Sequence, residues 1–187
     1  KAFDLSYDYI INPDEKIAEK GRKTEEAINT IDEKLTRYLI ALSSETLSQK
    51  EREILTNILD SSRDLERIGD HAEALINLTD YLQNKKVTFS PAALAELEEI
   101  YRQTSEFIKD ALDSVEHNDI EKAQDLVKRH EAINKMERVL RKTHICRLNK
   151  GECSTQAGVN FIDIISHYTR VSDHAMNLAE KVIAEQI

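Results

Sequence analysis

The sequence has few of the residues that interrupt regular structure. Trp is absent, and the 187 residues include only two prolines, two cysteines and four glycines. Proline and glycine are the strongest local breakers of helices and strands, so their scarcity favours long uninterrupted elements. The apolar positions are mostly Leu, Ile and Ala at spacings of three or four residues, which is the period of an α-helix. We therefore predict an all-α fold.

Other absences exclude classes of protein. No apolar run approaches the ~20 residues that span a bilayer, so we predict no membrane insertion by this segment. The net charge of −9 disfavours a nucleic-acid partner, because an acidic surface repels a phosphate backbone. Cys146 and Cys153 are too few for a zinc site or a disulfide framework and are predicted to be free thiols.

The sequence also lacks the motifs that support catalysis. It has no glycine-rich phosphate loop, no nucleophile elbow and no His-Glu-x-x-His segment. A ferritin-type di-iron oxidase needs Glu-x-x-His on two helices, and none of the six histidines has Glu three residues before it. We expect that the protein is not an enzyme.

An internal repeat organises the chain. Asp64-Leu-Glu-Arg-Ile-Gly-Asp-His-Ala72 is echoed 103 residues later by Thr169-Arg-Val-Ser-Asp-His-Ala175, and Glu26-Ala-Ile-Asn29 recurs as Glu131-Ala-Ile-Asn134. Two matched blocks in the same order indicate a duplication. We predict one compact unit of two repeats: residues 1–87, with an N-terminal arm and a helical hairpin, and residues 88–187, with three helices.

Capping signals and periodicity predict five long helices after the first dozen residues. Their expected ranges are 13–42, 48–84, 91–117, 118–149 and 154–187, with short connections typical of antiparallel bundles. The core stripes are predicted at Ile28, Ile31, Leu35, Leu39 and Leu42, and at Ile54, Ile58, Leu65, Ile68, Ala72, Leu75 and Leu82. Residues Phe3 to Asn12 alternate apolar and polar, and we predict an extended arm across the bundle, since a lone strand there is unfavourable.

An acidic ladder lies beside the second stripe. Glu66 and Asp70 share one helix face, and counting back from the connection at residues 43–48 places Glu25 and Asn29 opposite them. Oxygen ligands on two facing helices are how helical bundles build carboxylate metal sites, so the spacing predicts a site for iron, zinc, manganese or magnesium. A solvated acidic face, or compensation by Arg or Lys, is the alternative.

The second copy offers weaker ligands at the same level, where Asp173 faces His130 and Asn134. His71 and His174 follow the repeated aspartates and are turned about 100° from them around the helix. They are predicted to be helix-contact residues rather than ligands.

The segment Asp64 to Ala72 resembles the signature of the PhoU family, a Glu-Arg-Ile-Gly-Asp helix that occurs once in each of two three-helix repeats. The second half resembles the PhoU-type domain of bacterial sodium-dependent phosphate cotransporters. The segments that carry this resemblance are Arg141-x-x-His144-Ile-x-Arg147-Leu-x-x-Gly151-x-Cys153, Phe161-x-Asp163-Ile-Ile and Ser172-Asp-His-Ala175.

The resemblance implies a regulatory or accessory module of phosphate uptake on the cytoplasmic side of the inner membrane. It also implies a homodimer, a partner in the transmembrane part of a phosphate transporter, and in some members metal clusters on the acidic motifs. A start at Lys1 rather than Met fits excision from a larger membrane protein. The alternatives are a freestanding regulator of a phosphate ABC transporter and its sensor kinase, and a structural dimerisation module.

The resemblance assigns metal ligands residue by residue. Glu66 and Asp70 match the family motif, and Glu25 stands at the acidic position of the facing helix. The departures are Asn29 and Asn134 in place of Asp, Thr169 in place of the second Glu, and His130 at the second facing acidic position. Each departure removes a negative charge, so we expect the first site to bind a cation and the second to bind weakly or not at all.

Overall fold

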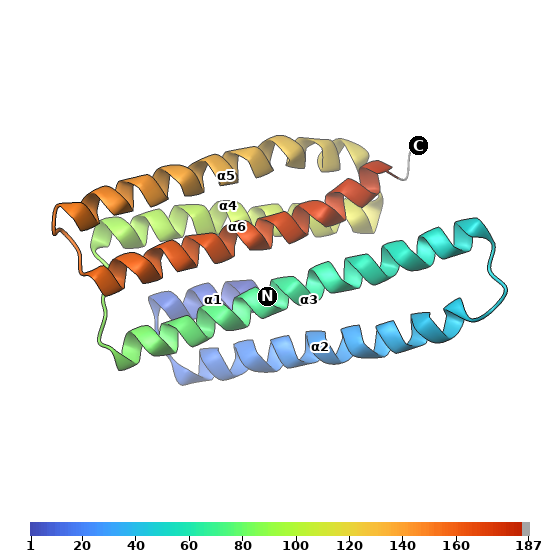
Figure 1. Ribbon diagram of the computed structural model, residues 1–187, viewed down its shortest axis with the longest axis horizontal. Helices are drawn as coiled ribbons and strands as arrows, with labels where there is room; N and C mark the ends of the chain where they lie inside the picture. Colours follow the sequence, from blue (N-terminus) through green and yellow to red (C-terminus); the bar gives the residue numbers. More distant parts are fainter. Residues whose placement is uncertain (185–187) are drawn as a thin grey trace.

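The computed structural model describes residues 1–184 and contains six α-helices, with no strand among these residues (Figure 1). The helices are α1 (Ala2–Ile11), α2 (Glu15–Ser43), α3 (Gln49–Asn84), α4 (Pro91–His117), α5 (Ile120–Asn149) and α6 (Thr155–Ala184). The all-α prediction is confirmed. The last helix was predicted to run to residue 187, and residues 185–187 lie outside the described part of the chain.

The helix boundaries follow the capping residues. The Ser48 hydroxyl accepts a hydrogen bond from the backbone N–H of Glu51, whose side chain accepts one from the Ser48 backbone, so both halves of a capping box are present. Ser90 caps α4 ahead of Pro91. Asn118 ends α4 with φ at 50°, in the left-handed region that stops a helix.

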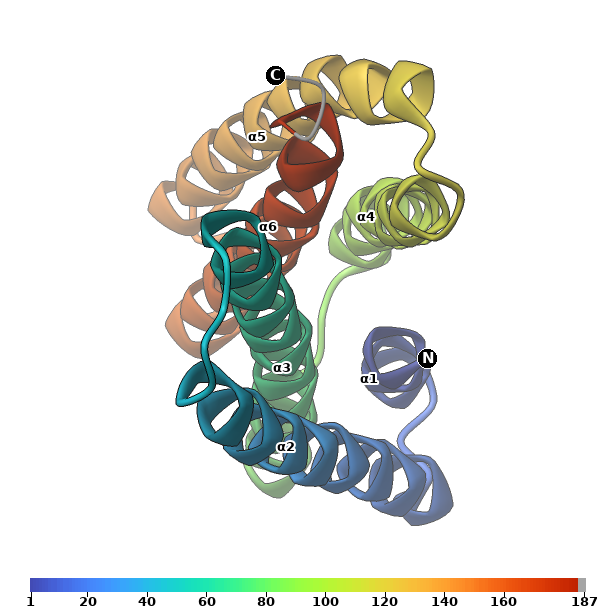
Figure 2. The same cartoon turned by 90° about the vertical axis from the view of Figure 1, so that its right-hand side faces the viewer.

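The two inner helices, α3 and α6, lie side by side, and each repeat packs its remaining helices on its own inner helix (Figures 1 and 2). One hydrophobic core runs through both repeats, with Phe3, Leu75, Phe107, Phe161 and Tyr168 nearly or fully buried. No helix in residues 1–184 combines the length and apolarity needed to cross a bilayer. Cys146 and Cys153 are free thiols, as predicted.

The predicted extended arm is wrong, because residues 2–11 form α1. Phe3, Ser6 and Ile10 are buried at spacings of three and four residues, which a helix places on one face. In a segment of ten residues this period overlaps with the alternation of Phe3, Leu5, Tyr7, Tyr9 and Ile11. Packing against α2, α3 and α4 selects the helix.

The predicted core stripes are only partly buried. Leu39, Ile68 and Leu75 are buried, whereas Ile31 is 63% exposed and Ile54 is 48% exposed. The reason is that the helix preceding the hairpin differs in length between the repeats. In the second repeat this helix is α4, with 27 residues, whereas in the first it is α1, with 10. Part of the α2–α3 hairpin therefore extends beyond α1 (Figures 1 and 2). Leu42, Ile58 and Leu65 are exposed as well.

Candidate functional site

The acidic residues of the first repeat gather where α2 and α3 pack closely at Gly69. A Cβ on Gly69 would meet Ile28 Cδ1 at 3.3 Å and Glu25 Cγ at 3.8 Å, so a larger residue would require the Ile28 side chain to shift by a few tenths of an ångström. Glu25 is buried, with 7% of its surface exposed. The structure thus brings Glu25 of α2 to the level of Glu66 and Asp70 of α3, as the residue count predicted.

Crowding of like charges disfavours ionisation here. Burial, and then the neighbouring carboxylates of Glu73, Asp70 and Glu66, raise the pKa of Glu25. Burial, and then Asp70, raise the pKa of Glu66. The cluster is therefore a place where a positive charge would be favoured.

Part of that positive charge comes from the same helix. Arg67 Nη1 lies 3.1 Å from Asp70 Oδ2, and Arg67 Nε lies 3.6 Å from Glu66 Oε2. The Asn29 amide donates a hydrogen bond to Glu25, and the Asn29 carbonyl oxygen is buried with no hydrogen-bond partner. Arg67 is the compensation by Arg that the sequence analysis held open.

The donor set, carboxylates and one amide oxygen, fits a hard cation such as magnesium, manganese or iron. Within residues 1–184, however, no three side chains of His, Cys, Asp or Glu lie close enough together to hold one ion. Cation binding at Glu25, Asn29, Glu66 and Asp70 would therefore require their side chains to move inward. The metal site stays a prediction.

Asp173 does not join this group, because it lies on α6 and belongs to the second repeat. Its Oδ1 lies 2.8 Å from His130 Nε2 on α5, and Asn134 Nδ2 lies 3.3 Å from the same nitrogen. The Thr169 hydroxyl donates to the Ile165 carbonyl of its own helix. The second repeat thus replaces a carboxylate cluster with one His–Asp pair.

Histidines line the seam between the repeats. His71 Nδ1 on α3 lies 3.1 Å from His167 Nδ1 on α6, and His174 Nδ1 on α6 lies 3.0 Å from Asp64 Oδ1 on α3. The prediction that His71 and His174 are helix-contact residues is confirmed. Burial, and then the two neighbouring histidines, lower the pKa of His71 to about 4.

Asp64 is the residue of this seam that the sequence analysis missed. It is buried on α3 and accepts hydrogen bonds from three α6 side chains: His174, Asn177 at 2.8 Å and Lys181 at 3.2 Å. With the repeat offset of 103 residues, the position equivalent to Asp64 in the second copy is His167, and the position equivalent to His71 is His174. The Asp64–His174 and His71–His167 contacts are therefore equivalent in the two copies, and the offset was the signal that could have revealed both.

The fold and these contacts define a class: a duplicated helical-bundle protein with an acidic motif on the inner helix of its first copy and polar contacts between its two inner helices. Catalytic geometry plays no part in this definition.

The model of the PhoU domain matches residues 1–79 and 97–182, and the chain belongs to the PhoU family. The phosphate-specific transport system accessory protein PhoU homolog 1 of Thermotoga maritima is 30% identical over 174 residues, covering 93% of this chain and 70% of its own length. The corresponding PhoU homolog of Pseudomonas aeruginosa is 24% identical over 178 residues, covering 93% of this chain and 72% of its own length.

Solved structures show the same fold. The crystal structure of PhoU from Pseudomonas aeruginosa superposes with a TM-score of 0.88 at 20% identity, covering 100% of this chain and 90% of that one. The phosphate transport system regulatory protein PhoU from Streptococcus pneumoniae superposes with a TM-score of 0.84 at 20% identity, covering 99% and 86%. The expected resemblance to the PhoU family is confirmed, whereas these relatives do not support the more specific resemblance to a cotransporter domain.

Proposed function

We propose that this protein is an accessory and regulatory protein of a phosphate transport system, acting in the cytoplasm by binding rather than by catalysis. The observation that carries the proposal is the alignment of 93% of the chain with a relative named as a phosphate-specific transport accessory protein. This is the alternative in the sequence analysis, and it replaces attachment to a sodium cotransporter as the preferred function.

The partner we propose is the membrane-embedded part of the phosphate transporter. Regulation by binding requires a surface whose charge or shape responds to the state of the cell. The acidic cluster at Glu25, Glu66 and Asp70 offers such a surface, because burial and neighbouring carboxylates raise the pKa of Glu25 and of Glu66, and a cation beside them would offset that crowding.

The test of this function is phosphate uptake in a host from which the gene has been deleted. We expect uptake of radiolabelled phosphate to lose its response to external phosphate, and the wild-type gene to restore it. The Glu66→Ala/Asp70→Ala protein should restore it poorly, whereas Glu99→Ala/Glu106→Ala, which removes two carboxylates paired with Arg102 on α4, should act as wild type. Unchanged regulation in the deletion strain would refute the proposal.

We further propose that the acidic cluster of the first repeat takes up a hard cation. Two observations favour it: the raised pKa of Glu25, and the buried Asn29 carbonyl oxygen without a partner. Elemental analysis of protein purified without chelator or histidine tag should find a metal that the Glu66→Ala/Asp70→Ala variant lacks and the Glu99→Ala/Glu106→Ala variant retains. Equal metal content in all three proteins would refute the site without touching the transport function.

A further inference from the structure

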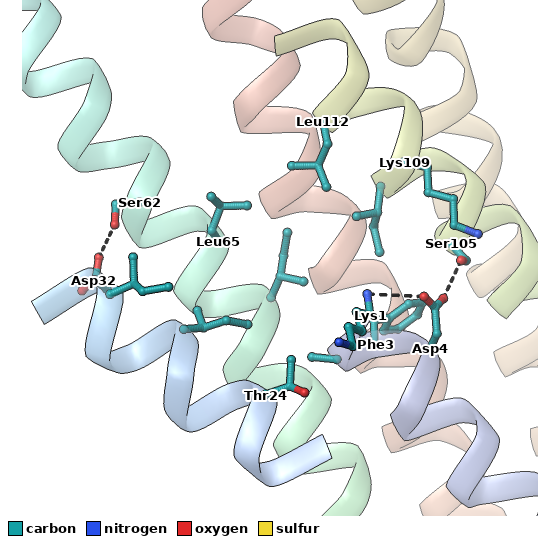
Figure 3. Close-up of a pocket in the computed structure, with 15 residues that line it drawn as sticks. Lys1, Phe3, Asp4, Thr24, Asp32, Ser62, Leu65, Ser105, Lys109 and Leu112 are labelled. Atoms are coloured by element: carbon teal, nitrogen blue, oxygen red, sulfur yellow. Dashed lines mark hydrogen bonds and ion pairs between the residues drawn. The ribbon is translucent and has the colours of Figure 1, made fainter. Parts of the chain in front are cut away.

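The two thiols of the chain lie outside the cavity shown in Figure 3. That cavity, of about 310 Å³, is mostly apolar, with Leu65 of α3 and Leu112 of α4 at its sides, and its lining includes neither cysteine. Cys146 lies on the last turn of α5, and Cys153 lies in the connection between α5 and α6.

The two thiols differ in their surroundings. Cys146 is exposed, whereas Cys153 is partly buried. The Cys153 Sγ lies 3.7 Å from His144 Nε2, within hydrogen-bond range for a sulfur atom, and among residues 1–184 the Cys146 sulfur has no such partner. Exposure alone would make Cys146 the more reactive thiol, whereas the contact with an imidazole favours Cys153.

The turn after α5 brings Cys153 back to His144. Gly151 has φ at 70°, in the left-handed region that glycine adopts without strain. The backbone N–H groups of Gly151 and Glu152 donate hydrogen bonds to carbonyls in the last turns of α5, each at 3.0 Å. This is the Schellman arrangement that ends a helix and reverses the chain, so the thiol returns alongside the helix it has just left.

His144 is held in place by the core. Only 1% of its surface is exposed, and its ring stacks on Phe161 at a centroid distance of 4.2 Å and an interplanar angle of 7°. Its Nδ1 is buried without a hydrogen-bond partner, so among residues 1–184 the thiol of Cys153 is the one partner of this ring. Burying an unpaired polar atom costs stability, and an apolar side chain would fill the same space without that cost. The buried imidazole therefore points to a role at the thiol.

The imidazole is in the right state to accept a proton. Burial, and then the neighbouring Arg147, lower the pKa of His144, so the ring is neutral at pH 7. Arg147 is itself paired with Glu96 of α4. A neutral imidazole beside a thiol can take up the thiol proton, which is how a histidine activates a cysteine as a nucleophile.

We propose that Cys153 is a site of reversible oxidation by peroxides, with His144 as the acceptor of its thiol proton. The sulfur attacks one oxygen of the peroxide, the thiol proton moves to His144 Nε2, and the O–O bond breaks. The leaving oxygen takes that proton from Nε2, so hydrogen peroxide is reduced to water while the sulfur is oxidised to a sulfenic acid. Two molecules of a small thiol then restore Cys153, with release of water and of their own disulfide.

The test treats the purified, reduced protein with hydrogen peroxide in the presence of dimedone, which traps sulfenic acids, and follows each cysteine by peptide mass spectrometry. Dimedone should label Cys153 well before the more exposed Cys146. His144→Phe keeps an aromatic ring to stack on Phe161 and should slow labelling of Cys153 by about tenfold or more. His117→Phe, at an exposed position at the end of α4, is the matched control and should label as wild type.

The comparison of the two thiols within the wild-type protein needs no substitution in the core, so it decides the proposal even if His144→Phe fails to fold. Cys146→Ser should leave the labelling rate unchanged, and Cys153→Ser should abolish early labelling. Labelling of Cys146 first, or of both thiols at equal rates, overturns the proposal. So does an unchanged rate at Cys153 in a His144→Phe protein whose circular dichroism matches the wild type. The assay uses purified protein, so its outcome is independent of the proposed transport function.

Discussion

Lowering the pH from 7 to 5 is expected to weaken the seam between the repeats, because burial and the nearby His167 and His174 hold the pKa of His71 at about 4. Arg170 and Arg67 act in the same direction. The unfolded chain takes up a proton on this histidine near pH 6.5, and the folded protein resists it. The unfolded state therefore binds more protons between about pH 6.5 and 4, and stability falls as the pH falls through that window.

The magnitude follows from the width of the window. Each pKa unit is worth about 1.36 kcal/mol, so the difference at pH 5 is about 2 kcal/mol for a fully buried group. His71 is half-buried, and screening by solvent reduces the expected loss to about 1–2 kcal/mol.

Urea unfolding followed by circular dichroism at pH 7 and pH 5 measures this loss. The His71→Gln protein keeps a polar side chain without a titrating group, so its stability should depend less on pH than that of the wild type by about 1–2 kcal/mol. His117→Gln, at an exposed position at the end of α4, is the matched control and should behave as wild type. If the His71→Gln and wild-type proteins lose the same stability between the two pH values, the reasoning is wrong.

Asp64→Ala should lower the free energy of unfolding by about 1–2 kcal/mol in urea titrations at pH 7, because it removes a buried carboxylate that accepts from three partly or fully exposed side chains of α6. An equal effect of Asp60→Ala, at an exposed position one turn earlier, would contradict this. Glu25→Gln should stabilise metal-free protein at pH 7 by a few tenths of a kcal/mol, because the raised pKa of Glu25 means that the fold disfavours its ionised form. The gain should vanish at pH 3.5, where the carboxyl group is protonated, and a loss of stability at pH 7 would contradict the expected sign. Tyr168→Phe should leave the thermal midpoint unchanged or raise it, because the buried Tyr168 hydroxyl has no hydrogen-bond partner. Tyr9→Phe should lower the midpoint, because it removes a 2.7 Å hydrogen bond to Asp80. A lower midpoint for Tyr168→Phe than for Tyr9→Phe would refute this.

The sequence was sufficient for features set within one helix or across one short connection. Ser48 and Ser90 act locally, so the starts of α3 and α4 could be placed from their capping residues alone. Glu25 could be placed opposite Glu66 by counting the same number of residues back along α2 and forward along α3 from their connection, because both helices rise by the same distance per residue.

Features set by contacts between distant segments were missed. The contact of His71 with His167 depends on where α3 and α6 meet, so finding it required the repeat offset to be applied across both helices rather than a pattern within either one. Ile31 is exposed because α1, with ten residues, does not extend along the α2–α3 hairpin as far as Ile31. The apolar character of Ile31 alone therefore predicted burial wrongly. The helical state of α1 depends on packing as well, since its ten residues fit two periods.

The shared core has a consequence for how the duplicated copies coexist. Phe3 of the first copy makes ring contacts with Tyr101 and Tyr168 of the second, at centroid distances of 5.6 and 5.2 Å, and Tyr7 stacks on Tyr101. Melting one copy would expose the apolar surface of the other, so calorimetry should record a single cooperative transition. The two copies therefore unfold together: a substitution that destabilises one of them lowers the stability of the whole protein by the same amount.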